Sequence, residues 1–173
     1  MKNHLRPLSS QNNSRNRFYI LLFFLQLGVW NVNAQEKTRS EIALEYINAY
    51  YAQDSALYSI HMQDSIRWSD PTSKEIGTAI TEVKGKQAVL SHLSNISRDI
   101  VSMDFKMDNS FFSDIYAIFE GFLNYSWQDF QTKKIYHFNI RTVMVLKFDG
   151  KKIVEHIDYA DFKALKKQFG AQR

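Results

Sequence analysis

An aspartate near the carboxyl end of the chain, Asp158, has the surroundings expected of a general base. It follows the strand-like run 151–157, which the hairpin signal Asp149-Gly150 precedes. A carboxylate at the end of a strand can face a pocket, and an apolar aromatic pocket raises its pKa by desolvation, so that it can accept a proton near neutral pH. The alternative is structural, because the pattern predicts a helix over 158–169 that Asp158 would cap.

Asp70 is the second candidate catalytic residue. It ends a short predicted strand over 65–70, in which Ile66 and Trp68 share one face. Pro71 follows directly, and Asp-Pro is also a common turn signal. Asp70 therefore either enters the same pocket as Asp158 or holds a turn.

Aromatic and polar side chains elsewhere are predicted to line this pocket. They are Tyr50, Tyr58, Trp68, Glu120, His137, Arg141, His156 and Tyr159. His137 and Arg141 share one face of a predicted strand over 135–148, and Tyr136 and Phe138 share the other. The aromatic set favours an outward polar face, although a curved sheet can bury both faces.

Motifs for a metal or a cofactor are missing from the sequence. His156 and Asp158 have the spacing of part of an iron-binding facial triad, but no histidine follows to complete it. The HExxH and GxSxG patterns and a glycine-rich phosphate loop are also absent from the sequence. We therefore expect neither a metal nor a cofactor.

The elements that would position these residues fall into two groups. Helical spacing after a capping box at Thr38–Glu41 predicts a helix to about Gln53. The other predicted elements are a second helix from Asp54 or Ser55 to about Met62, a loop with a weak strand over 71–84, a helix over 86–96, and strands over 100–112, 115–127, 135–148 and 151–158. Helices that precede a strand meander indicate an α+β fold.

The first 34 residues are predicted to be a signal peptide. Four basic residues and no acidic residue lie in this segment, and an apolar run of 13 residues spans Phe18–Trp30. Val32-Asn33-Ala34 suits cleavage before Gln35, which would export the protein to the periplasm or the medium. An uncleaved anchor is the alternative, but the run is shorter than the roughly 20 residues of a spanning helix.

Net charge and composition exclude some partners of the remaining domain, 35–173. Without its four leading basic residues, the chain has 18 basic and 18 acidic residues, so we expect no nucleic-acid partner. The chain has no cysteine and is stabilised by its core alone. We expect no membrane span after cleavage.

Several segments together resemble the nuclear transport factor 2-like superfamily, and its SnoaL-like branch in particular. The segments are Ala52-Gln53-Asp54, Trp68-Ser69-Asp70-Pro71, Gly85-Lys86-Gln87-Ala88-Val89, Phe148-Asp149-Gly150-Lys151-Lys152-Ile153 and Asp158-Tyr159. The resemblance covers nearly all of 38–170. It implies a cone-shaped roll, in which a curved antiparallel sheet wraps around about three N-terminal helices and encloses a cavity.

Enzymes of this superfamily place acids at comparable positions. Asp158 looks like the late acid of limonene epoxide hydrolase and SnoaL-like cyclases, and Asp70 resembles the early acid of ketosteroid isomerase. The hydrolase pattern also needs an arginine two residues from a second acid, whereas Phe119-Glu120-Gly121-Phe122 has one acid and no arginine. This departure disfavours epoxide hydrolysis.

Three functions follow from these observations. The first is binding of a small apolar or aromatic molecule, which the aromatic content and the neutral charge favour. The second is a cofactor-independent lyase, isomerase or hydrolase with Asp158 as base. The third is an interaction domain that forms a homodimer. Fold alone does not choose among them.

Overall fold

A computed structural model describes residues 36–173 of the chain. Residues 1–35, which include the predicted signal peptide, lie outside the described residues. Among the helices of residues 36–173, none has the length together with the apolar character that a bilayer crossing would need.

The first two helices begin where their capping residues predict. Helix α2 (Arg39–Tyr51) has the capping box: the Thr38 hydroxyl accepts a hydrogen bond from the Glu41 amide, and the Glu41 carboxylate accepts one from the Thr38 amide. Helix α3 (Ser55–Ser59) is capped by Asp54, whose carboxylate accepts from the amide of Leu57 at 3.0 Å. Helix α3 is therefore shorter than expected, and the next strand starts at Met62.

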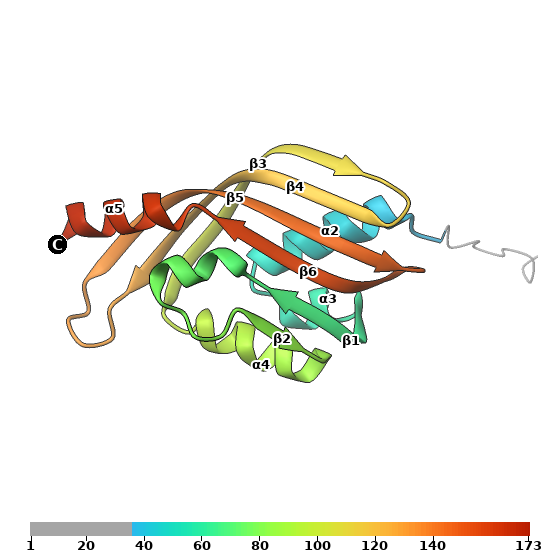
Figure 1. Ribbon diagram of the computed structural model, residues 1–173, viewed down its shortest axis with the longest axis horizontal. Helices are drawn as coiled ribbons and strands as arrows, with labels where there is room; N and C mark the ends of the chain where they lie inside the picture. The colour runs from blue at the N-terminus through green and yellow to red at the C-terminus, as the bar shows by residue number, and fades with distance from the viewer. Residues whose placement is uncertain (1–35) are drawn as a thin grey trace, which may run out of the picture. The chain divides into compact units, whose positions relative to one another are not determined.

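Six strands form one curved sheet in the order β2-β1-β6-β5-β4-β3 (Figure 1). Their bounds are β1 (Met62–Ser69), β2 (Glu82–Lys84), β3 (Ile100–Phe112), β4 (Tyr116–Gln128), β5 (Ile135–Asp149) and β6 (Lys152–Ala160). A 3-10 helix, η1 (Pro71–Ile76), follows β1, and helix α4 (Lys86–Ile96) precedes β3. The predicted α+β class and the predicted curved sheet are confirmed. The sheet is mixed rather than purely antiparallel, because β1 pairs with β6 in parallel.

A bulge bends the long hairpin of β3 and β4. The register shifts between Met107 and Asn109, so Asp108 is an extra residue opposite β4. Gly121 lies opposite this bulge, and a Cβ atom there would come within 2.2 Å of the Lys106 carbonyl oxygen. Only glycine allows this close approach of the two backbones.

The last helix begins later than the sequence pattern predicts. Helix α5 (Phe162–Gln172) is capped by Asp161, whose carboxylate accepts from the Ala164 amide at 2.9 Å. Strand β6 continues to Ala160, which pairs with Thr142 of β5. Asp158 is therefore a strand residue, and the alternative that it caps the last helix is wrong.

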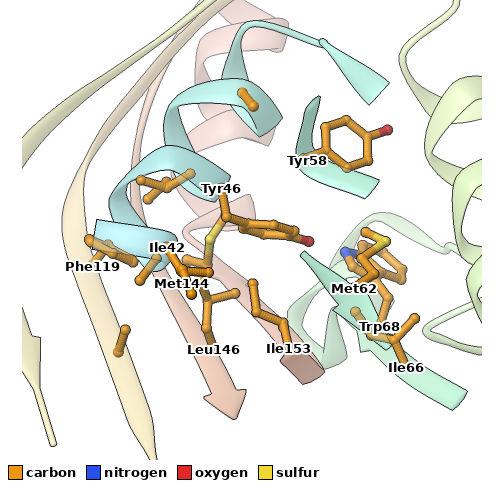
Figure 2. Close-up of a cluster of buried hydrophobic side chains, with 14 of the residues drawn as sticks. Ile42, Tyr46, Tyr58, Met62, Ile66, Trp68, Phe119, Met144, Leu146 and Ile153 are labelled. Atoms are coloured by element: carbon orange, nitrogen blue, oxygen red, sulfur yellow. The ribbon is translucent and has the colours of Figure 1, made fainter. Parts of the chain in front are cut away.

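The hydrophobic core lies between the first helices and the concave side of the sheet. In Figure 2 the ring of Tyr46 extends from α2 among side chains of the sheet, including Met144 and Leu146 of β5 and Ile153 of β6. All four of these side chains are fully buried. This core holds α2 in place and so positions the aromatic side chains that α2 supplies to the site.

Helix α5 lies along the part of β5 whose edge on the β6 side has no partner strand. Strand β6 ends before it can pair with residues 135–141 of β5. The Gln168 side chain accepts from the Asn139 amide and donates to the Asn139 carbonyl, at 2.9 and 2.7 Å. Gln172 does the same at His137, at 2.8 and 2.7 Å. Two glutamines one helical turn apart thus replace the missing strand.

Candidate functional site

The helices and the concave side of the sheet enclose a cavity of about 810 Å³. This volume is within the usual range of small-molecule sites. Its lining is largely apolar and comes from nearly every element. Among its lining residues are Tyr50, Tyr51, Tyr58, Trp68, Ile76, Leu93, Met103, Leu123, Tyr125, Trp127, Phe138, Ile140, Leu165 and Phe169.

Asp158 lines the cavity and is held by three hydrogen bonds. Its Oδ2 accepts from the Tyr50 hydroxyl and from Trp68 Nε1, each at 3.1 Å. Its Oδ1 lies 3.0 Å from His156 Nε2. Asp158 is 8% exposed. Three elements, α2, β1 and β6, thus fix this carboxylate in one orientation.

A fourth hydrogen bond continues this network into the core. The Tyr46 hydroxyl lies 2.8 Å from His156 Nδ1, and both side chains are fully buried. If the Asp158 carboxylate accepts from His156 Nε2–H, then Nδ1 carries a lone pair and accepts from Tyr46. The series Tyr46, His156, Asp158 is therefore a continuous buried line of hydrogen bonds from the core to the cavity.

Burial keeps the neighbouring phenols protonated. It raises the pKa of Tyr46, Tyr50 and Tyr51 well above the usual tyrosine value, and the negative charge of Asp158 raises all three further. Each of these hydroxyls is therefore a hydrogen-bond donor at neutral pH.

Asp70 also lines the cavity, and it holds the turn that the sequence suggested. Its Oδ1 accepts from the Thr72 amide, the Ser73 amide and the Thr72 hydroxyl, at 3.0, 3.0 and 2.6 Å. Asp70 is 7% exposed, and burial, with a smaller contribution from the Asp158 charge, raises its pKa. The two interpretations from the sequence, pocket residue and turn residue, therefore both describe this side chain.

His92 is a cavity residue that the sequence analysis missed. Its ring lies 4.7 Å from the Trp68 ring, centroid to centroid, and neither ring nitrogen has a hydrogen-bond partner within residues 36–173. Burial lowers its pKa. The available signal was its position on α4, three residues after Val89 and four before Ile96, on the face that the apolar residues define.

Four predicted pocket residues do not line the cavity. Glu120 and Arg141 form an ion pair with each other, and Arg141 also pairs with Asp108. His137 bonds to Ser126 at 2.8 Å, and Tyr159 is 41% exposed. The alternation of β5 turns Phe138 and Ile140 toward the cavity, so His137 and Arg141, which alternate with them, face outward.

The other predicted catalytic and pocket residues lie together at the cavity. Tyr50, Tyr58, Trp68, Asp70 and Asp158 all line the cavity, and His156 lies behind Asp158. Within residues 36–173 no cluster of three or more acidic, histidine or cysteine side chains has the arrangement of a metal site.

Apolar side chains surround the mouth of the cavity. Ile76 after β1, Ile80 in the loop before β2 and Ile96 at the end of α4 all line the cavity and are 42%, 52% and 49% exposed. Exposed apolar groups gathered at one opening commonly mark a ligand or partner site. An apolar molecule would meet an apolar entrance here.

No family model and no curated protein matches this sequence. Solved structures do match. A candidate SnoaL-like polyketide cyclase from Shewanella denitrificans OS-217 is 21% identical, with a TM-score of 0.68 over 77% of this chain and 97% of that chain.

Two further structures show the range of these matches. A nuclear transport factor 2-like protein of unknown function from Burkholderia pseudomallei K96243 is 16% identical, with a TM-score of 0.63 over 77% of this chain and 98% of that one. TerC, co-crystallised with polyporic acid, is 12% identical, with a TM-score of 0.60 over 75% and 96%. This chain therefore has the nuclear transport factor 2-like fold, in the form that SnoaL-like proteins share.

Proposed function

We propose that this protein binds a small, largely apolar or aromatic molecule in the cavity. The observation that carries the proposal is a cavity of about 810 Å³ that aromatic and aliphatic side chains line and that Ile76, Ile80 and Ile96 border at its mouth. A few fixed polar groups in an apolar pocket are the usual design of a small-molecule site. TerC, which has the same fold, was co-crystallised with an organic ligand, polyporic acid.

Titration with N-phenyl-1-naphthylamine, a neutral probe that fluoresces in apolar surroundings, tests this proposal. The test variant is Ala160→Phe, because Ala160 lines the cavity and a phenyl ring there would occupy it. We expect saturable binding to the wild type and affinity lower by about tenfold or more in Ala160→Phe.

The matched control is Ala164→Phe, the same change at a residue of α5 that is not part of the cavity lining. It should bind like the wild type, and circular dichroism checks that both variants fold. Equal binding by Ala160→Phe and Ala164→Phe would place the probe elsewhere and contradict the proposal.

A second function, proton transfer by Asp158, is favoured by one specific observation. Asp158 is not a helix cap, and it faces the cavity at the end of the line from Tyr46 through His156. A general base must be held within reach of its substrate, and a buried partner can orient it. This arrangement supports a lyase, isomerase or hydrolase reaction on the bound molecule without a cofactor.

Asp158→Asn tests this second function. The amide keeps the size of the side chain but cannot accept a proton, so turnover of any substrate should fall by about 100-fold or more. Binding of the neutral probe should persist, which separates loss of chemistry from loss of the cavity. Turnover that survives in Asp158→Asn would contradict the assignment of Asp158 as the base.

A further inference from the structure

One carboxylate oxygen in the cavity is unused. Asp70 Oδ1 accepts three hydrogen bonds, whereas no group of residues 36–173 donates to Oδ2. The side chain is more than nine-tenths buried and belongs to the cavity lining. Because Oδ2 retains accessible surface, a ligand or a water molecule in the cavity can donate a hydrogen bond to it.

A second aspartate in the same chain shows that the turn alone does not require this burial. Asp129, in the loop between β4 and β5, also accepts from the amides two and three residues ahead, at 2.9 and 2.7 Å. Asp129 is only half-buried, and hydrogen bonding lowers its pKa, whereas burial raises the pKa of Asp70. The same turn geometry therefore occurs on the surface, at no cost in buried charge.

The remaining charges of the cavity are unfavourable for an anion. Asp158 is a second carboxylate, and the protein already donates to both of its oxygens. Lys166 is the one lysine or arginine among the lining residues of the described chain, and it is exposed on α5. Burial lowers the pKa of His92, so its ring is neutral at pH 7.

We propose that Asp70 determines ligand specificity: its free oxygen accepts a hydrogen bond from a hydroxyl group on an otherwise apolar or aromatic molecule. This inference rests on the proposed binding function and adds the chemical class of the ligand. A ligand that offers only an acceptor leaves Asp70 Oδ2 unpaired, and a ligand carboxylate would lie near two acidic side chains with no buried cation to offset it. Sites built to bond a hydroxyl reject analogues that lack one.

Equilibrium dialysis at pH 7 with three naphthalenes tests this. 2-Naphthol offers a hydroxyl donor, 2-methoxynaphthalene offers only an acceptor, and 2-naphthoate is an anion. For the wild type we expect 2-naphthol to bind about tenfold or more tightly than 2-methoxynaphthalene, and 2-naphthoate to bind most weakly.

Asp70→Asn is the informative variant, because the amide oxygen can keep the three bonds of the turn and place an NH₂ donor where Oδ2 lies. The preference for 2-naphthol over 2-methoxynaphthalene should then disappear, and 2-naphthoate should gain affinity. Asp129→Asn is the control, since it changes the same turn chemistry outside the cavity, and its affinities should equal those of the wild type.

The results separate this inference from the proposed function. If 2-naphthol and 2-methoxynaphthalene bind the wild type equally, or if Asp70→Asn keeps the preference, Asp70 does not select the ligand and the cavity still binds apolar molecules. If none of the three binds, the binding function and the role of Asp70 are both overturned.

Discussion

At the scale of single residues, the site depends on acids that the fold keeps in different surroundings. Asp158, Asp70 and Asp161 all lie close to the start of a helix in the sequence. Asp161 caps α5, and Asp158 remains in strand β6. Asp70 caps η1 and also lines the cavity. The chemistry of each residue follows from which backbone amides it bonds and how deeply it is buried.

Asp70 gives a prediction about stability and pH. Its pKa is raised in the folded state, so the folded protein holds this proton more tightly than the unfolded chain. The stability that Asp70 contributes relative to Asp70→Asn is therefore fully present below about pH 3.8 and is lost as the pH rises through the raised pKa. Urea unfolding of both proteins from pH 3 to pH 7 measures this difference.

Asp129→Asn provides a control of opposite sign. The pKa of Asp129 is lowered in the folded state, so its contribution is present above about pH 3.8 and is lost as the pH falls. If the change in unfolding free energy had the same pH dependence for Asp70→Asn and Asp129→Asn, the opposite pKa shifts of Asp70 and Asp129 would be contradicted.

The limits of the sequence also appear at this scale. The alternation of β5 predicts correctly that His137 and Arg141 share one face, and it favours an outward position for that face without fixing it, because a curved sheet can bury both faces. The inner face is fixed by the long-range packing of Phe138 and Ile140 toward the cavity. His92 was missed because a lone histidine among apolar helix residues gives no chemical signal until its tertiary neighbours are known.

At the scale of elements, most strands and helices could be predicted because their periods are clear. The strand over 100–112 and the helix over 86–96 have the predicted bounds. The parallel pairing of β1 with β6 could not be predicted, since it joins segments about 90 residues apart that no local pattern connects. The N-cap of α5 is Asp161, three residues after the predicted cap Asp158, because several acids near the start of this helix can each serve as a cap.

Gly121 gives a prediction for the curved hairpin. Gly121→Ala would bring its Cβ against the backbone of β3 at Lys106 and Met107, which cannot move aside as a side chain would. We expect a loss of about 1–3 kcal/mol in the free energy of unfolding, measured by urea denaturation. Gly170→Ala is the control, because a Cβ at Gly170 meets nothing within 4 Å. Similar unfolding free energies for the two variants would contradict the close approach.

The contact between α5 and β5 gives a prediction for individual amides. Gln168→Ala should speed hydrogen exchange at the Asn139 amide, and Gln172→Ala should do so at His137, because each glutamine accepts from that amide. Lys167→Ala, a neighbouring exposed change, should alter neither amide. Exchange measured by NMR that shows no residue-specific effect would mean that the glutamines do not replace the missing strand.

At the scale of the whole molecule, the charge balance depends on the first 34 residues. These carry four of the 22 basic residues and no acidic residue, so the remaining chain is formally neutral. We predict that they are removed on export. The intact mass of the exported protein should then equal that of a chain that begins at Gln35. An exported protein that still starts at Met1 would contradict this cleavage.

The α+β class and the order of the elements were predictable because most elements have a clear period, whereas the curved sheet was implied by the family resemblance. The full set of residues that line the cavity could not be predicted, because its walls combine side chains from α2, α3, β1, η1, α4, β3, β4, β5, β6 and α5. No segment alone encodes its volume or the outward turn of the Glu120–Arg141 ion pair. The complete fold is needed to show which apolar side chains form the cavity and that Asp70 and Asp158 both lie in its wall.

The most direct test is a crystal structure of the protein with N-phenyl-1-naphthylamine. We predict that the aromatic rings lie inside the cavity, in contact with Trp68, Leu123 and Phe138, which line it. Rings bound on the outer face of the sheet, beside Glu120 and Arg141, with the cavity free of the probe, would contradict the binding function.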